Sequence, residues 1–238
     1  MGGDDRIVAK VVADSRRKGV YRIELDDGRT FDVHEDVLVR FRLVKGARVS
    51  AALLDGVLEE ARLQQAYRDA LRFLGRAMRS AGEVRAKLEA KGHEPDVIDD
   101  VLKRLKGERL VDDEAFAETL ARERLALGRK GRLWIRRELA ARGVGKAEAE
   151  RALASIDPRD EWEQAWRLAS RRWPSIRGDL PARMHKAMNM LIRRGFPPDV
   201  ARSVVLKLKS EHPVPEGSGE AGTADGPDGG RQDAPDAE

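Results

Sequence analysis

The stretch LEAKGHEPDVIDDVLKRL, residues 88–105, carries a pattern that the chain repeats twice more. The second copy is LAARGVGKAEAERALASI at 139–156, and the third is LIRRGFPPDVARSVVLKL at 191–208. In each copy a leucine stands four residues before a glycine, and small or aliphatic residues follow that glycine at offsets of 6, 9, 10 and 13. These offsets share one face of an α-helix, and the leucine belongs to the preceding helix. The sequence therefore predicts tandem helix–glycine–helix units.

The glycines of the three copies, Gly92, Gly143 and Gly195, lie 51 and 52 residues apart. A period of this length is typical of extended arrays in which each unit packs on its neighbours. One further helix before each copy completes a three-helix unit. We predict first helices at 63–78, 113–127 and 158–172, second helices at 80–91, 132–142 and 182–194, and third helices at 96–106, 146–156 and 198–209. The fold class is mostly α, an elongated array of tandem three-helix repeats.

Two helix starts in the array carry clear signals. Ser80 with Glu83 fits a capping box, in which each side chain satisfies a backbone N–H of the first turn. The acidic run Asp112-Asp113-Glu114 could hold Mg²⁺, but acids at the start of a helix are also what the helix dipole favours. We interpret Asp112 or Asp113 as the cap of the helix that carries Phe116, and Phe116 and Leu139 as core residues.

The N-terminal residues follow a different, β-rich pattern. Ile7–Val12 is a β-branched run, and apolar and polar residues alternate in Tyr21–Leu25. Asp27-Gly28 is a favourable hairpin turn, and Thr30–Val33 supplies the returning strand. A hairpin alone is marginally stable. This small β-rich module is therefore expected to add strands from its ends and to pack on the next helix.

A long helix is predicted from about residue 50 to 79, with Gly56 as a candidate break. The last 28 residues contain 8 acidic and 1 basic side chain, 6 glycines and 4 prolines, a composition that predicts disorder. The expected units are a β-rich module at 1–50, a linking helix with the first repeat at 51–110, the second repeat at 111–157, the third repeat at 158–210, and an acidic tail at 211–238.

Composition argues against several classes of function. The chain has no cysteine, and its four histidines lie far apart, so we expect no metal site and no cofactor. No nucleophile–base pair is recognisable, and we expect no enzyme. No apolar run approaches the roughly 18 residues of a membrane helix. The start, Met1-Gly-Gly-Asp-Asp, lacks signal-peptide features, so we expect a cytoplasmic protein without a membrane anchor. We also expect the protein to be a monomer.

Positive charge is concentrated in the repeats. Residues 63–210 hold 33 basic and 22 acidic side chains, whereas residues 1–62 hold 12 of each. Such clustering favours an anionic partner. The alternative is a solvated surface whose arginines pair with acids of neighbouring helices. The candidate partner-binding residues are Arg122, Arg124, Arg129, Lys130, Arg132, Arg136, Arg137, Arg183, Lys186, Arg193 and Arg194.

Three stretches resemble the RecX family of recombination regulators, which bind the RecA recombinase. They are MRSAGEVRAKLEAKG at 78–92, LVDDEAFA at 110–117 and GRKGRLWIRRELAARGV at 128–144. The order of Asp-Asp-x-x-Phe-Ala, Gly-Arg-x-Gly and Glu-Leu-x-x-x-Gly is specific, and the likeness runs from about Ala66 to Leu208. His93 and Gly75 depart from the family pattern.

The resemblance implies a curved array lying in the groove of the RecA–DNA filament. There it would inhibit ATP hydrolysis, strand exchange and co-protease activity, and so restrain recombination and the SOS response. The basic faces would meet acidic groups of the filament or compete with DNA phosphates. The alternative function is a stand-alone basic helical module that binds DNA without a protein partner, through phosphate contacts.

Overall fold

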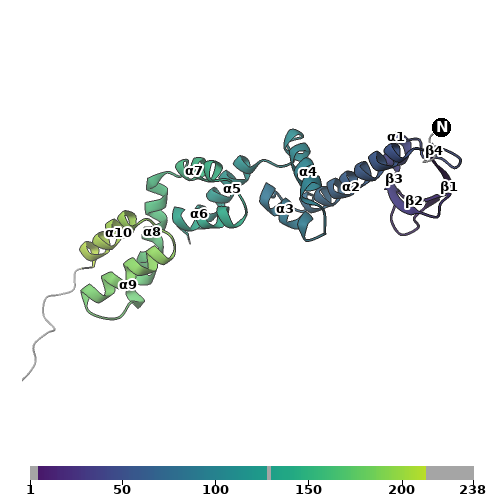
Figure 1. Ribbon diagram of the computed structural model, residues 1–238. Helices are drawn as coiled ribbons and strands as arrows, with labels where there is room; N and C mark the ends of the chain where they lie inside the picture. The colour runs from purple at the N-terminus through teal and green to yellow at the C-terminus, as the bar shows by residue number, and fades with distance from the viewer. Residues whose placement is uncertain (1–4, 128–129, 213–238) are drawn as a thin grey trace, which may run out of the picture.

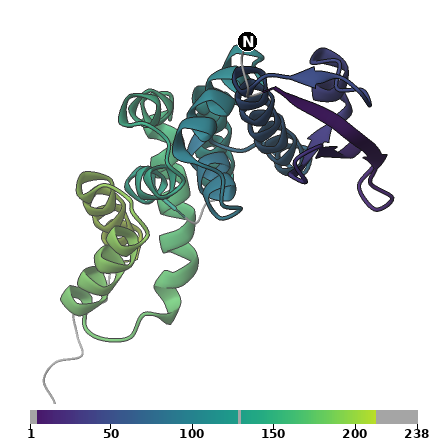
Figure 2. The same ribbon diagram turned by 45° about the vertical axis from the view of Figure 1, so that its right-hand side comes forward.

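The computed structural model describes residues 5–127 and 130–212, which form an elongated molecule (Figure 1). A small sheet lies at the N-terminal end, and helices follow one another along the length in chain order (Figure 1). A second view shows that this row of helices follows a curve (Figure 2). The mostly α, elongated and curved array expected from the sequence is therefore confirmed.

The N-terminal module is a four-stranded antiparallel sheet with the order β3-β2-β1-β4. Its strands are β1 (Arg6–Ala13), β2 (Val20–Leu25), β3 (Thr30–His34) and β4 (Arg48–Val49), and a short helix α1 (Glu35–Arg40) follows β3. Gly28 has the positive φ of +83° that its hairpin turn requires. Leu54 and Val57 of the next helix complete the module's core, so the module packs on that helix as expected.

The long helix α2 (Ala51–Leu74) runs without interruption, so the predicted break at Gly56 is wrong. A glycine inside a helix costs only about 1 kcal/mol relative to alanine. Packing outweighs that cost, because Leu54 and Val57 on either side of Gly56 are buried in the sheet module. The helix ends at Leu74, with Gly75 as its C-cap, a few residues before the predicted end at about 79.

Three repeats follow, each with its own hydrophobic core. Repeat 1 consists of the C-terminal half of α2 with α3 (Ala81–Glu89) and α4 (Pro95–Gly107). Repeat 2 consists of α5 (Asp113–Ala126), α6 (Arg132–Ala141) and α7 (Lys146–Ala154). Repeat 3 consists of α8 (Pro158–Arg172), α9 (Leu180–Arg193) and α10 (Pro198–Glu211), with the short 3-10 helix η1 (Trp173–Ser175) between α8 and α9. The division of the chain into units at 50, 110, 157 and 210 stays a prediction.

The repeated sequence pattern corresponds to buried positions. Leu88, Leu139 and Leu191 are all 0% exposed, and the residues at offsets 6, 9, 10 and 13 are buried in all three repeats. Gly92, Gly143 and Gly195 have φ values of +81°, +72° and +82°, which other residues adopt only with strain. We call the turn at each of these glycines an elbow. Each elbow joins the second helix of a repeat to its third.

Neighbouring repeats meet where the N-terminus of one second helix packs on the next repeat's elbow. At the first joint, between repeats 1 and 2, a Cβ atom on Gly82 would lie 2.5 Å from the Cα atom of Gly143. Ser80 Oγ also donates a hydrogen bond of 2.5 Å to the carbonyl oxygen of Arg142. The two backbones are in direct contact, and only glycine permits this approach.

The second joint, between repeats 2 and 3, has the same construction. A Cβ atom on Gly131 would lie 2.5 Å from both the carbonyl oxygen of Gly195 and the Cα atom of Phe196. The N–H of Gly131 donates to the carbonyl of Arg194 at 3.0 Å, and the N–H of Leu133 donates to that of Gly195 at 3.0 Å. At both joints the N-terminus of a second helix packs on the next repeat's elbow, and this repeated contact places the repeats in a row.

Candidate partner-binding surface

Each joint includes a carboxylate from the first helix of the following repeat. Asp113 Oδ1 accepts from the N–H of Ala81 at 2.7 Å, and Glu161 Oε1 accepts from the N–H of Arg132 at 2.8 Å. Backbone N–H groups at a helix N-terminus carry partial positive charge, which a carboxylate neutralises. Glu161 is 0% exposed, and its second oxygen pairs with Arg132 Nε at 2.5 Å. Arg132 is thus part of the second joint.

A second ionic network crosses the first joint. Arg142 of repeat 2 pairs with Glu83 of repeat 1 at 2.9 Å and with Glu138 of its own helix at 2.9 Å. Arg124 holds both oxygens of Glu138 at 2.8 Å. The hydrogen bonds from Arg124, and then those from Arg142, hold the pKa of Glu138 below its ordinary value against the opposing effect of burial.

The structure therefore separates the described arginines among the predicted binding residues into two groups. The first group serves the array itself. Arg124 and Arg132 are half-buried and paired with acids of neighbouring helices, as the solvated-surface alternative anticipates. Arg183 lies over the ring of buried Trp173, 4.5 Å from its centroid, and Arg194 contributes its carbonyl to the second joint.

The second group faces solvent. Arg122 on α5, Arg137 on α6 and Arg193 on α9 are exposed, and within the described part of the chain none of them forms an ion pair. Arg136 is exposed and pairs with the equally exposed Glu150 at 3.0 Å, a contact of small energetic weight. These four side chains keep their charge available to a partner.

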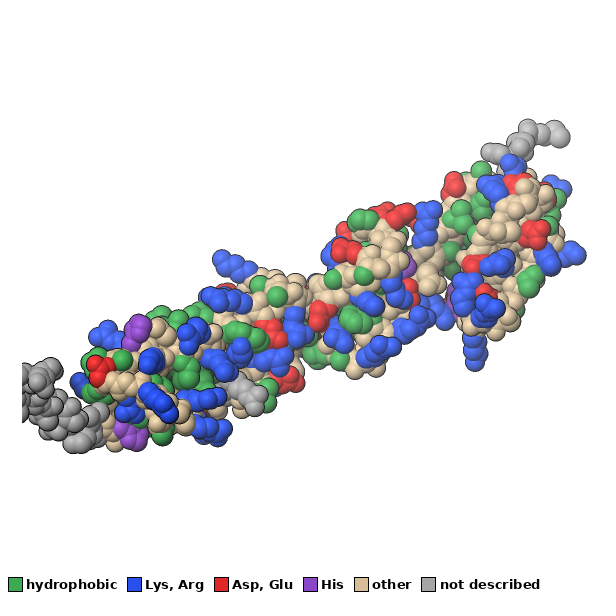
Figure 3. Space-filling model, turned by 90° about the horizontal axis from the view of Figure 1, so that it is seen from below, with side chains coloured by type: hydrophobic (Ala, Val, Ile, Leu, Met, Phe, Trp, Pro, Cys, Tyr) green, Lys and Arg blue, Asp and Glu red, His purple; other side chains and the backbone are tan. Residues whose placement is uncertain are grey.

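Two predicted lysines are anchored but keep an accessible charge. Lys130 Nζ lies 4.0 Å from the ring centroid of Trp134, and exposed Lys186 donates to the carbonyl of Arg177 at 2.8 Å. Arg129 lies outside the described residues. Figure 3 shows lysine and arginine side chains gathered on one face over repeats 2 and 3. The positive charge that the sequence assigns to the repeats is therefore displayed on their surface.

The tryptophans of repeat 3 differ in their exposure. Trp173 is buried, but Trp162 and Trp166 are half-buried and stack on each other, with ring centroids 5.7 Å apart. Lys207 lies over both rings, at 5.1 Å and 4.9 Å from the centroids. Both rings pack against the core of repeat 3 and stay partly exposed.

Sequence reasoning missed the acidic acceptors and the small residues of the joints. Of the two predicted caps of α5, Asp112 makes the capping contact, whereas Asp113 reaches across to repeat 1, a role that its position in the sequence does not predict. Ser80 and Gly131 both stand 12 residues before an elbow glycine, and this spacing is a signal that the sequence does contain. Within residues 5–127 and 130–212, no group of three potential metal ligands is present and no helix is long and apolar enough to cross a membrane.

Comparison with known proteins gives the array a family. The RecX first, second and third three-helix domains match residues 66–105, 112–153 and 159–205. The chain belongs to the RecX family. Regulatory protein RecX of Geobacillus kaustophilus is 39% identical over 175 residues, covering 73% of this chain and 65% of that protein. Regulatory protein RecX of Halalkalibacterium halodurans is 33% identical over 196 residues, covering 80% and 73%.

Solved structures agree with the fold of this RecX-family chain. A crystal structure of regulatory protein RecX superposes with a TM-score of 0.69 at 28% identity, covering 84% of this chain and 98% of that one. RecX from Lactobacillus salivarius superposes with a TM-score of 0.59 at 23% identity and covers 63% of this chain, a likeness of fold alone. The chain is therefore a member of a family of regulatory proteins.

Proposed function

We propose that this protein inhibits RecA-mediated recombination and the SOS response by lying along the groove of the RecA–DNA filament. The observation that carries the proposal is the elongated row of repeats, which displays unpaired cations on repeats 2 and 3. An elongated body can contact several protomers of a polymer at once, so modest contacts add by avidity. Blocking ATP hydrolysis, strand exchange and co-protease activity would then follow from occupying the groove.

The contact residues proposed from the structure are Arg122, Lys130, Arg136, Arg137, Lys186 and Arg193, and Arg129 stays a candidate from the sequence. Arg124, Arg132, Arg183 and Arg194 act as positioning residues that hold the repeats and their surface in place. In this proposal the protein acts as a cytoplasmic monomer and transforms no substrate.

The test is ATP hydrolysis by RecA on single-stranded DNA with increasing amounts of this protein. We expect inhibition at or below equimolar ratios, because one elongated molecule covers more than one protomer. Undiminished hydrolysis at equimolar protein would contradict the proposal.

The second candidate is a stand-alone DNA-binding module, which the exposed arginines favour. It requires tight binding to naked duplex DNA, with an affinity that falls linearly with the logarithm of salt concentration at a slope of about −0.9 per neutralised phosphate. Weak binding with a shallow salt dependence, together with inhibition of RecA, would favour the filament regulator.

A further inference from the structure

The elbow of repeat 1 lacks the contact that fills the other two elbows. In repeats 2 and 3 the elbow glycine touches the second helix of the preceding repeat, whereas the described residues before repeat 1 form the sheet module instead of a repeat. A Cβ atom on Gly92 would meet nothing within 4 Å. A cleft of about 390 Å³ lies here, between the elbow, α2 and the sheet module, and its lining includes Gly92, His93, Arg62, Gln65 and His34.

This cleft occupies the place where a preceding repeat would pack. The buried alanines Ala66, Ala117 and Ala165 mark equivalent points on the first helices of the three repeats. Four residues before them stand Arg62, Asp113 and Glu161. Asp113 and Glu161 are the two carboxylates that accept N–H groups from the preceding repeat, and Arg62 lines the cleft.

Arg62 of repeat 1 is positively charged, whereas the equivalent residues Asp113 and Glu161 are negatively charged. The Arg62 side chain is 62% exposed, and its contact with Glu94 is long, at 3.7 Å. Lys91, which corresponds to the joint residue Arg142, is instead tied back to Asp69 of α2 at 2.5 Å. A segment entering this cleft would therefore meet a cation where the two internal joints offer an acid. The lining also holds two acids: Asp32 pairs with Arg17 at 2.5 Å, and Glu94 is the distant neighbour of Arg62. Because Arg62 has no close acidic partner, we expect the cleft to take an occupant that carries a carboxylate.

The second helix of repeat 3, at the other end of the array, does not fit this cleft in a second copy of the chain. Ser80 and Gly131 stand 12 residues before their elbows, and the corresponding residue in repeat 3 is Arg183. Arg183 lies inside α9, covers Trp173 and donates to its carbonyl at 3.1 Å. A side chain of this size prevents the close backbone approach made by Gly82 or Gly131. Head-to-tail packing of two copies is thereby disfavoured.

We propose that the cleft at Gly92 binds the first turn of a helix from the protein partner. A small residue of that turn packs on Gly92, a backbone N–H or hydroxyl group donates to the carbonyl of Lys91, and an acidic side chain pairs with Arg62. The two internal joints provide the template for this contact. The inference rests on the proposed function, because it takes the RecA filament to be that partner.

A photo-crosslinking experiment tests this assignment in the full-length protein. Gln65, an exposed residue of the cleft, is replaced by p-benzoylphenylalanine, and the variant is irradiated on RecA–single-stranded DNA filaments. We expect a cross-link to a RecA residue in the first turn of a helix with an acid within that turn. The same probe at Arg76, which is exposed outside the cleft, should not cross-link to this segment.

Charge reversal provides the second readout. Arg62→Glu should weaken filament binding about fivefold or more, as expected when an interface residue worth more than about 1 kcal/mol is lost. Arg76→Glu should bind like the wild type, and a lysine in place of the identified RecA acid should restore binding of Arg62→Glu.

The outcomes separate this inference from the proposed function. Wild-type binding accompanied by unchanged binding of Arg62→Glu, or cross-linking of Gln65 only to a second copy of this chain, would overturn the inference alone. No binding by the wild type would overturn both.

Discussion

A Cβ atom on Gly82 would stand 2.5 Å from the Cα atom of Gly143, so repeats 1 and 2 touch backbone to backbone. Because this distance is far below a normal carbon–carbon contact, an added methyl group must separate the two helices or displace the elbow. The backbone at Gly143 cannot move easily, because its φ is +72° and the carbonyl oxygen of the preceding residue, Arg142, accepts a hydrogen bond from Ser80. The spacing of the array therefore depends on residues that carry no side chain.

Gly82→Ala should lower the free energy of unfolding by about 1–3 kcal/mol, the usual cost of overpacking a tight contact. Gly107→Ala is the matched control, because a Cβ atom there meets nothing within 4 Å and alanine favours the helix by about 1 kcal/mol. Urea denaturation followed by circular dichroism measures both changes. Equal stability of the two variants would show that the joint accommodates the methyl group.

Glu161→Ala should destabilise the protein by about 2–3 kcal/mol, because it removes an acceptor of hydrogen bonds from a charged group and from a helix N-terminus. Glu163→Ala, two residues away, removes a pair with Arg167 whose side chains are both exposed, and should cost less than about 0.5 kcal/mol. Thermal unfolding compares the two variants. A similar loss in both would argue against a structural role for the second joint.

Glu138 should contribute to stability only while it is ionised. Its pKa in the folded protein lies below the ordinary value of 4.5, because Arg124 and Arg142 stabilise the carboxylate. The contribution is therefore present above about pH 4.5 and is lost as the pH falls through the folded-state pKa. The difference in unfolding free energy between wild type and Glu138→Gln should be constant near neutral pH and shrink below pH 4.5. A difference that does not change with pH would contradict this assignment.

Reversing both Arg122 and Arg137 to glutamate should weaken binding to the RecA–DNA filament at least fivefold and reduce inhibition of ATP hydrolysis. Lys18→Glu combined with Lys45→Glu, at two exposed positions of the sheet module, makes the same change in net charge and is the control. The circular dichroism spectrum should stay that of the wild type, since neither arginine forms an ion pair among the described residues. If the module variant is equally weak, then general charge rather than this surface determines binding.

Removing residues 213–238 should strengthen DNA or filament binding at low salt. This segment contains seven acidic residues and one arginine, and it follows directly on the cationic repeat 3. A tethered anionic segment competes with weak anionic partners at a high effective concentration. Fluorescence anisotropy at two salt concentrations measures the effect, which should diminish as salt rises. If the variant binds DNA and the filament with unchanged affinity, the segment does not screen the repeats from anionic partners.

Particular residues show how far the sequence could lead. Leu88, Leu139 and Leu191 were assigned to helix faces from spacing alone and are fully buried, because helical periodicity is a local property. The helix break predicted at Gly56 does not occur for the opposite reason, since the packing that holds α2 together there comes from the sheet module. Arg122 and Arg132 belong to the same basic stretch of the sequence, which does not distinguish them. In the structure Arg122 is exposed, whereas Arg132 is held by Glu161, which lies 29 residues further along the chain.

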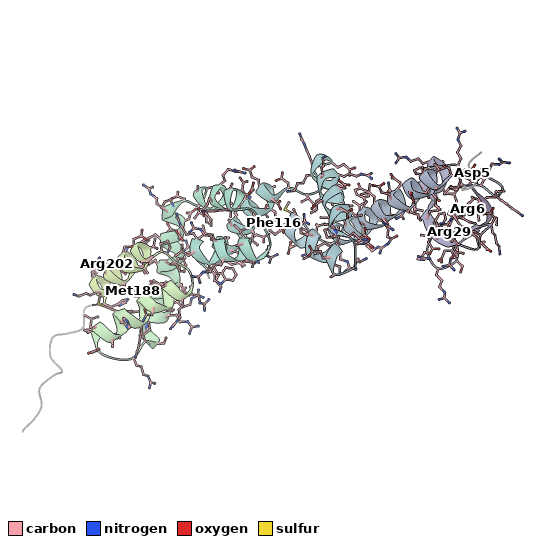
Figure 4. The ribbon with its side chains drawn as sticks, viewed as in Figure 1. Asp5, Arg6, Arg29, Phe116, Met188 and Arg202 are labelled. Carbon is pink, nitrogen blue, oxygen red and sulfur yellow. The ribbon has the colours of Figure 1, made fainter. Side chains whose placement is uncertain are left out.

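Arg202 and Arg29 lie near opposite ends of the elongated molecule (Figure 4). Most contacts in the array therefore form within one repeat or between neighbouring repeats. The amino-acid sequence by itself determined the repeats, their helices, their buried faces and the sign of their charge, because these depend on neighbours within one or two turns. Only the tertiary structure decided which arginines are neutralised and which elbow is left open. Those outcomes depend on pairs such as Arg142 and Glu83, which are 59 residues apart and meet only once the glycines of the joint have packed together.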